Sequence, residues 1–255
     1  MKRIFALIGV VLLVSCSQKA KTNQEIDASV TEQTTENENI KPLPKDAVYI
    51  PDAIFKNYLL NNEAINTNGD DEIQITEAQT FTGEILVFRM GITDLTGIEA
   101  FTSLTLLDCL GNQLTSLNVS NNTALTSLYC STNKLTALDV SKNTALTELL
   151  CDVNQLTTLD VSNNTELSLL SCTNNQIKEL DLSKNIALTL FYCQNNKLIT
   201  LNLKNNSNTQ IKRMRIDNNP NLRCIKVDNP TFSAENWKGE LFWLDDGLIF
   251  SKDCK

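Results

Sequence analysis

Hydrophobic positions recur with a fixed period from Leu104 onward. Five consecutive 21-residue segments follow the pattern LxxLxCxxNxLxxLDVSxNTA, with conservative replacements at the apolar places. A looser sixth copy follows a two-residue insertion near Asn208, and a degenerate copy upstream contains Leu86, Phe88, Ile92 and Leu95. Self-similarity of this length predicts a solenoid of about seven coils, because each coil can bury its apolar side chains only against its neighbours.

Within each half of a repeat the apolar residues stand two apart, as in the pairs Leu128 with Cys130 and Leu138 with Val140. This alternation is typical of a short strand with one buried face. We therefore expect a mainly β solenoid in which every coil contributes two short parallel strands, one to each of two sheets.

The repeat resembles the leucine-rich repeat, specifically the irregular 21-residue bacterial class in which both halves carry a similar motif. The match covers residues 84–229, and the architecture is internalin-like in general terms. The resemblance implies a rod with a small helical cap over residues 46–83 and a second cap over residues 230–255.

Three sets of residues keep the 21-residue spacing, two of asparagines and one of cysteines. Asparagines at both corners of the coil are expected to bond backbone groups that the turns leave open, and the same residue in adjacent coils. A ligand-binding amide row is the alternative. The cysteines replace a core leucine and are expected to form a buried column of thiols, with a metal or redox role as the alternative. The sets are Asn112, Asn133, Asn154, Asn175 and Asn196; Asn122, Asn143, Asn164, Asn185 and Asn206; and Cys109, Cys130, Cys151, Cys172 and Cys193.

Cys224 and Cys254 fall outside this column. In an exported protein a leftover pair usually forms a disulfide, here one that closes the carboxy-terminal cap.

Residues 1–15 are predicted to be an export signal, with Lys2 and Arg3 before an apolar run that is too short to span a bilayer. The run ends in Leu-Val-Ser-Cys, which resembles the bacterial lipobox and implies a lipid on Cys16; a plain secretory signal is the alternative. Residues 16–45 have almost no large apolar side chains and are predicted to be a disordered tether. We expect a lipid-anchored protein of the cell envelope, at the outer membrane or cell surface, that contacts the membrane through the lipid only.

The amino-terminal cap contains a helix predicted to start at Pro51 and a loop similar to a twelve-residue EF-hand. The candidate calcium ligands are Asn66, Asn68, Asp70, Glu72 and Glu77. Asn66 replaces the usual first aspartate, and Asp71 stands in the place of the usual glycine, so any calcium site is expected to be weak. The alternative is a loop held by its own Asn and Asp turn bonds.

Outward side chains of the first sheet mix leucines and tyrosines with charges, as protein-binding patches do. The candidate face comprises Leu106, Asp108, Tyr129, Glu148, Leu150, Leu169, Leu190, Tyr192, Arg213 and Arg215. A surface without a partner is the alternative. Outward residues of the second sheet are small or polar, and its three stacked aspartates, Asp139, Asp160 and Asp181, raise the further alternative of a bound cation.

The composition excludes several classes of function. The 255 residues include no histidine, which removes the catalytic systems and metal sites that need an imidazole. A net charge of −8 argues against nucleic acid, because phosphate recognition needs clustered Lys and Arg. We predict no enzyme and no certain cofactor beyond possible Ca²⁺. The main hypothesis is a lipoprotein whose solenoid binds a protein or glycan, and the alternative is a structural or adhesive envelope component without a specific ligand.

Overall fold

The computed structural model describes residues 44–254. The predicted signal peptide, the lipidation site at Cys16 and the tether up to residue 43 lie outside these residues. In the part of the chain that is described, no helix is long and apolar enough to cross a membrane.

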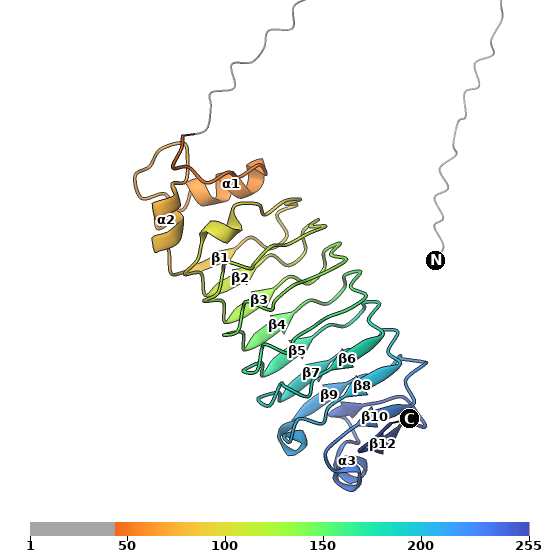
Figure 1. Cartoon of the computed structure of the whole chain (residues 1–255). Coiled ribbons are helices and arrows are strands. Elements are labelled where there is room, and N and C mark those ends of the chain that lie inside the picture. Colours follow the sequence, from red (N-terminus) through yellow and green to blue (C-terminus); the bar gives the residue numbers. More distant parts are fainter. Residues whose placement is uncertain (1–43, 255) are drawn as a thin grey trace, which may run out of the picture. The chain divides into compact units, whose positions relative to one another are not determined.

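The described residues form a parallel β-solenoid, which confirms the predicted fold class. Its first sheet has eight strands in the order β1-β2-β3-β4-β5-β7-β9-β11, and Figure 1 shows them following one another along the stack. Their bounds are β1 (Glu84–Leu86), β2 (Leu106–Asp108), β3 (Ser127–Tyr129), β4 (Glu148–Leu150), β5 (Leu169–Ser171), β7 (Leu190–Tyr192), β9 (Arg213–Arg215) and β11 (Phe242–Trp243).

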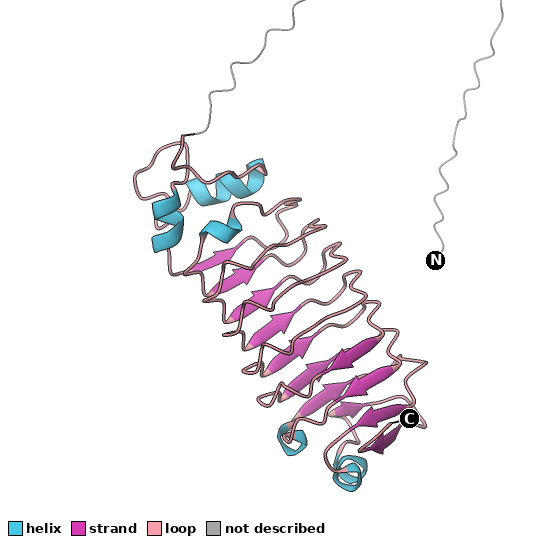
Figure 2. Ribbon diagram, viewed as in Figure 1, coloured by secondary structure: helices cyan, strands magenta, loops and turns pink. Residues whose placement is uncertain are grey.

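The second sheet has four strands, β6 (Glu179–Asp181), β8 (Thr200–Asn202), β10 (Cys224–Lys226) and β12 (Ile249–Ser251), in the order β12-β10-β8-β6. The prediction of a second strand in every coil is therefore wrong for the earlier coils, which have loops at these places (Figure 2).

The hydrogen bonds between neighbouring coils change where the second sheet begins. Between the earlier coils, the Nδ2 group of an asparagine in the next coil donates a hydrogen bond to a valine carbonyl. The acceptors are Val119, Val140 and Val161, at 2.9, 3.0 and 2.9 Å. From β6 onward the backbone pairs directly: Leu182 N donates to Asn202 O, and Leu203 N to Lys226 O, both at 2.8 Å. The second sheet therefore begins with β6, the first strand whose backbone pairs directly with the next coil.

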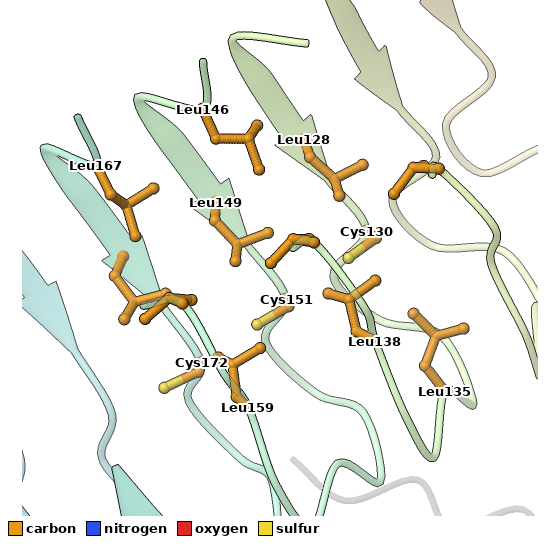
Figure 3. Close-up of a cluster of buried hydrophobic side chains, with 14 of the residues drawn as sticks. Leu128, Cys130, Leu135, Leu138, Leu146, Leu149, Cys151, Leu159, Leu167 and Cys172 are labelled. Carbon is orange, nitrogen blue, oxygen red and sulfur yellow. The ribbon is translucent and has the colours of Figure 1, made fainter. Parts of the chain in front are cut away.

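The core is a set of columns that run through the stack. The middle residue of each first-sheet strand from β1 to β9 is buried, and the leucines of the turns pack against it. Figure 3 shows Leu128, Cys130 and Leu138 of one coil beside Leu149, Cys151 and Leu159 of the next. Burying one leucine side chain contributes about 1.5 to 3 kcal/mol, so regular stacking supplies most of the driving force.

The repeated asparagines are part of the scaffold. Asn133 Nδ2 donates to the carbonyls of Cys109 and Cys130 at 3.0 and 3.1 Å, and its Oδ1 accepts from Leu114 N at 3.0 Å. Asn154, Asn175 and Asn196 repeat these bonds one coil at a time. The amides thus bond backbone groups of neighbouring coils rather than one another.

Two local predictions are wrong. In the first coil Ile85 and Val87 are buried, whereas Leu86 and Phe88 point outward, because a shift of one residue exchanges the faces of a strand. At the insertion before η2 (Asn208–Gln210), Asn205 takes the buried corner and Asn206 is exposed.

The amino-terminal cap consists of α1 (Ala53–Leu60), α2 (Ile75–Thr80) and the short 3₁₀ helix η1 (Ile98–Ala100). Helix α1 begins two residues later than predicted, because the carboxylate of Asp52 accepts the N–H groups of Ile54 and Phe55 at 3.0 and 3.1 Å. The other oxygen of Asp52 accepts from Thr93 N at 2.9 Å, which fastens the cap to the first coil.

The carboxy-terminal cap extends both sheets. After α3 (Pro230–Asn236), strand β11 pairs with β9 and β12 pairs with β10. Trp237 is buried between Phe242 and Phe250. The predicted disulfide joins Cys224 and Cys254, with their Cα atoms 5.7 Å apart.

Candidate binding face

The strand register aligns the outward side chains of the first sheet in rows. Each outward position flanks a buried one, and all ten predicted face residues lie on this outward side. One row contains Glu84, Leu106, Ser127, Glu148, Leu169, Leu190 and Arg213, and the other contains Leu86, Asp108, Tyr129, Leu150, Ser171, Tyr192, Arg215 and Trp243. We call these two rows the first-sheet face. Partner binding at this face stays a prediction.

The middle of the face is apolar and held in place. The Tyr129 hydroxyl donates a hydrogen bond to the carboxylate of Glu148 in the next coil. Burial and this hydrogen bond raise the pKa of Tyr129, so the phenol stays protonated. Leu150 lies beside Tyr129, Leu169 beside Glu148 and Leu190 beside Leu169, and all three leucines are partly buried. A side chain fixed in the free protein loses little entropy on binding.

Beside the face, Asp152 organises a polar patch. Its Oδ1 accepts from Thr173 N at 2.7 Å and from the Ser171 hydroxyl, and its Oδ2 accepts from the Ser131 hydroxyl at 3.2 Å. Three consecutive coils are thereby tied together through one carboxylate. The patch is rigid and polar, as the rim of an interface is.

The carboxy-terminal end of the face carries an aromatic residue that the sequence analysis missed. The Arg215 guanidinium lies over the Trp243 ring at 4.4 Å, and Arg215 Nε lies 3.5 Å from Asp217 Oδ1. Trp243 is 50% exposed. It escaped prediction because β11 belongs to the cap and has no place in the 21-residue period.

The amino-terminal end also has more apolar surface than expected. Leu86 is 41% and Phe88 52% exposed, since both point outward from the first coil. Exposed aromatic side chains thus stand near both ends of the first-sheet face. Checking the strand alternation of residues 84–88 against the following coil would have found them.

The five cysteines of the column have low thiol reactivity. All five are free and buried. Burial raises the pKa of every one of these thiols, that of Cys130 to about 12, so almost no thiolate forms at neutral pH. Among residues 44–254, no three His, Cys, Asp or Glu side chains are grouped so as to hold a metal.

The EF-hand-like loop is held together by its own polar groups. Glu77 Oε1 accepts from Thr67 N at 2.8 Å and Asn68 N at 3.2 Å, and its Oε2 accepts from Gln74 N at 3.0 Å. Burial opposes ionisation of Glu77, but these bonds outweigh it and lower the pKa. Asn66 is buried, and its Oδ1 accepts from Gly69 N.

The remaining candidate ligands of the loop also form an ion pair or hydrogen bonds with neighbouring side chains. Glu72 forms an ion pair with Lys56 at 2.7 Å, and Asp70 accepts from Asn68 Nδ2 and Gln74 Nε2 at 3.0 and 2.9 Å. Positive φ occurs at Gly69, whereas Asp71 has none. The loop as folded does not offer an ion a full shell of free oxygens, and calcium binding stays a prediction.

The stacked aspartates of the second-sheet side are bonded locally. Asp139, Asp160 and Asp181 each accept the backbone N–H of the serine two residues on, at 2.9, 2.9 and 2.8 Å. The hydrogen bond from Ser141 lowers the pKa of Asp139, which is therefore a carboxylate at neutral pH. Local turn bonds account for this row without an ion.

Comparison with solved structures places this geometry in a known class. The functional domain of InlJ from Listeria monocytogenes, described as including a cysteine ladder, has 32% identity and a TM-score of 0.58 over 82% of this chain. The chain spans about half, 48%, of that domain. An internalin, InlF, from the same species has 23% identity and a TM-score of 0.53, covering 79% of this chain and 71% of that one. No family model and no curated protein matches the chain.

These likenesses define the class of the chain. It is an internalin-like leucine-rich-repeat solenoid.

Proposed function

We propose that this chain is a non-catalytic binding module that recognises a protein through the first-sheet face. The observation that carries the proposal is the alignment of partly exposed leucine, tyrosine and tryptophan side chains along one regular sheet, with fixed charges between them. Aromatic and aliphatic anchors of this kind supply most of the energy of protein interfaces. The internalin-like fold supports the proposal, because it presents such a face on a rigid stack.

Few side chains of this chain are of the types that usually act as catalytic bases or nucleophiles. The sequence has no histidine, and the five repeated thiols are buried with raised pKa values. Neither an imidazole base nor a reactive thiolate is therefore at hand.

The central test replaces Tyr129 and Leu150 together with serine. Both side chains are outward, so we expect the Tm to remain almost unchanged while capture of a protein from an envelope or host-surface extract falls at least about tenfold. The matched control is Thr157→Ser with Thr158→Ser, two exposed residues on the opposite side, which should capture normally.

The outcomes separate the hypotheses. Capture that survives the Tyr129 and Leu150 changes would favour a structural or adhesive role without a specific ligand. Capture that resists proteolysis of the extract and is lost after periodate oxidation would identify a glycan instead of a protein. A large fall in Tm would show that the two side chains support the core.

We also propose that the chain is anchored to the cell envelope by a lipid on Cys16. The support is the sequence of the signal and the lipobox-like residues before Cys16. Cys16→Ser should move the protein from the detergent phase to the aqueous phase in a phase-partition experiment, while mass spectrometry detects no acyl chain. Continued partition into detergent by this variant would contradict the anchor.

Calcium binding at the amino-terminal loop is a separate proposal. The affinity expected from its few charged ligands is in the range of about 10⁻⁴ to 10⁻³ M. Millimolar calcium should raise the Tm of the chain but not of its Glu77→Gln variant. An equal Tm with and without calcium would support a loop that is held by its own hydrogen bonds.

A further inference from the structure

A cleft of about 550 Å³ opens on the outward side of the second sheet, where the end of the chain is fastened to β10. Its exposed apolar side chain is Ile199, which is 54% exposed, whereas Leu180 and Leu201 behind it are buried in the core. The disulfide between Cys224 and Cys254 forms part of the wall. This volume lies within the usual range for small-ligand sites, about 300 to 1,000 Å³.

Opposite charges line the two sides of this cleft. Glu179 and Asp181 come from β6, and Arg223 and Lys226 come from the β10 side. Strand β8 lies between β6 and β10, so that Asp181, Asn202 and Lys226 stand side by side in one row. Two strand spacings, about 9.6 Å, separate the backbones of Asp181 and Lys226, and no ion pair joins their side chains in the described residues.

These charges are not neutralised by neighbours. Within residues 44–254, Glu179, Arg223 and Lys226 take part in no ion pair. Asp181 Oδ1 accepts from Ser183 N and Asn202 Nδ2 at 2.8 and 3.1 Å. Burial opposes ionisation of Asp181, but these bonds and the charge of Lys226 lower its pKa.

The change of sign is confined to the last coil. Equivalent positions in successive coils hold acids or amides, namely Asn118, Asp139, Asp160, Asp181 and Asn202, and only then the cation Lys226. The cleft lies where this row changes from negative to positive. Local turn bonds explain the aspartates, but they do not explain a lysine that follows them in the same row beside the exposed Ile199.

The geometry points to a binding site for a short zwitterionic peptide, with its amino group on Glu179 and Asp181 and its carboxylate on Lys226 and Arg223. An extended chain spans at most about 3.3 to 3.6 Å per residue, so about three residues bridge the two sides. A central apolar side chain would rest on Ile199 and the disulfide between Cys224 and Cys254. The site is distinct from the first-sheet face and does not depend on the function proposed for that face.

The test is calorimetric titration of the full chain with alanyl-leucyl-alanine that has free ends. We expect saturable binding. Acetylating the amino end or amidating the carboxyl end should each weaken it at least about tenfold, because a charge-assisted hydrogen bond is lost. Lys226→Met and the double variant Glu179→Gln with Asp181→Asn should have the same effect as the respective blocked peptides.

Matched controls keep the result interpretable. Lys184→Met and Asp139→Asn remove the same charges outside the cleft and should leave the affinity unchanged. Thr200→Trp fills the cleft without altering its charge and should abolish binding, with circular dichroism confirming the fold. The Tyr129 and Leu150 serine variant should bind the peptide normally, even if it fails to capture a protein.

Three results would overturn the assignment. These are the absence of saturable binding, equal affinity for the blocked and free peptides, and unchanged affinity in the charge variants that line the cleft.

Discussion

Single amide side chains hold the corners of the coils. A buried amide without partners would be costly, yet each asparagine of the inner row bonds backbone groups of two coils. At the other corner Asn143 Nδ2 donates to two carbonyls of the preceding coil, Val119 O and Asn122 O, both at 2.9 Å. Asparagine suits these places because its NH₂ group has two donors.

Replacing Asn143 with alanine should therefore be costly. The carbonyls of Val119 and Asn122 each lose one of two donors, since Asn122 N and Leu125 N still donate to them, and we expect the free energy of unfolding to fall by about 0.5 to 1.5 kcal/mol for each hydrogen bond lost. Urea denaturation measures the change. Exposed Thr144→Ala is the matched control and should stay within about 0.5 kcal/mol of the parent. A variant as stable as the control would mean that water replaces the amide.

Glu77 gives the amino-terminal cap a dependence on pH. Its pKa is lowered in the folded chain from the ordinary value of 4.5, so its contribution to stability is complete above that value and is lost as the pH falls through the folded pKa. Asp52, whose pKa is also lowered by hydrogen bonds that outweigh burial, acts in the same direction. Urea midpoints measured between about pH 7 and pH 3 should fall less steeply for Glu77→Gln than for the parent. Parallel curves would contradict this role.

The residue-scale predictions succeeded where the period was regular. The inner asparagines and the cysteine column were placed correctly because five copies agree on their spacing. Asn206 was misplaced because the insertion before η2 shifts the corner by one residue. Leu86 and Phe88 were taken for core because one degenerate copy cannot fix its own register.

At the scale of the elements, the first sheet could be predicted and the second only in part. Alternating apolar residues indicate an extended segment but do not say which backbone groups it pairs with. In the earlier coils the equivalent segments do not pair as strands, and only β6, β8, β10 and β12 form the second sheet. Strands β11 and β12 could not be foreseen because residues 230–255 carry no repeat.

The cysteine column and the disulfide should differ in reactivity. Under native conditions a thiol reagent should label none of the five cysteines of the column, because they are buried with raised pKa values. After mild reduction, Cys224 and Cys254 should be labelled first. Opening this bridge of 30 residues should lower the free energy of unfolding by about 3 to 4 kcal/mol in the chain-entropy model. Peptide mapping by mass spectrometry reads each position, and early labelling of Cys151 would contradict a closed core.

At the scale of the whole described unit, each coil buries its apolar side chains against its neighbours. The two ends of the stack lack one neighbour, and they are covered in different ways. The amino-terminal cap covers the first coil with Phe55 and Leu59, while the carboxy-terminal cap adds a strand to each sheet. This division also explains the candidate site. Its middle follows from the repeats, whereas its ends, Leu86 and Trp243, depend on how the stack is terminated.

Removal of residues 237–255 should destabilise the stack well beyond the loss of the disulfide. The deletion takes away β11 and β12, so the outer edges of β9 and β10 lose their hydrogen-bond partners and the packing of Trp237 is lost. Unpaired edges and exposed apolar surface favour association. We expect a lower Tm and earlier elution in size-exclusion chromatography than for the full chain. The matched control, Cys224→Ser with Cys254→Ser, keeps both strands and should elute as the full chain does. If the deletion and this control had the same Tm and elution volume, the strands of the cap would contribute nothing beyond the disulfide, and the solenoid would need no cover at this end.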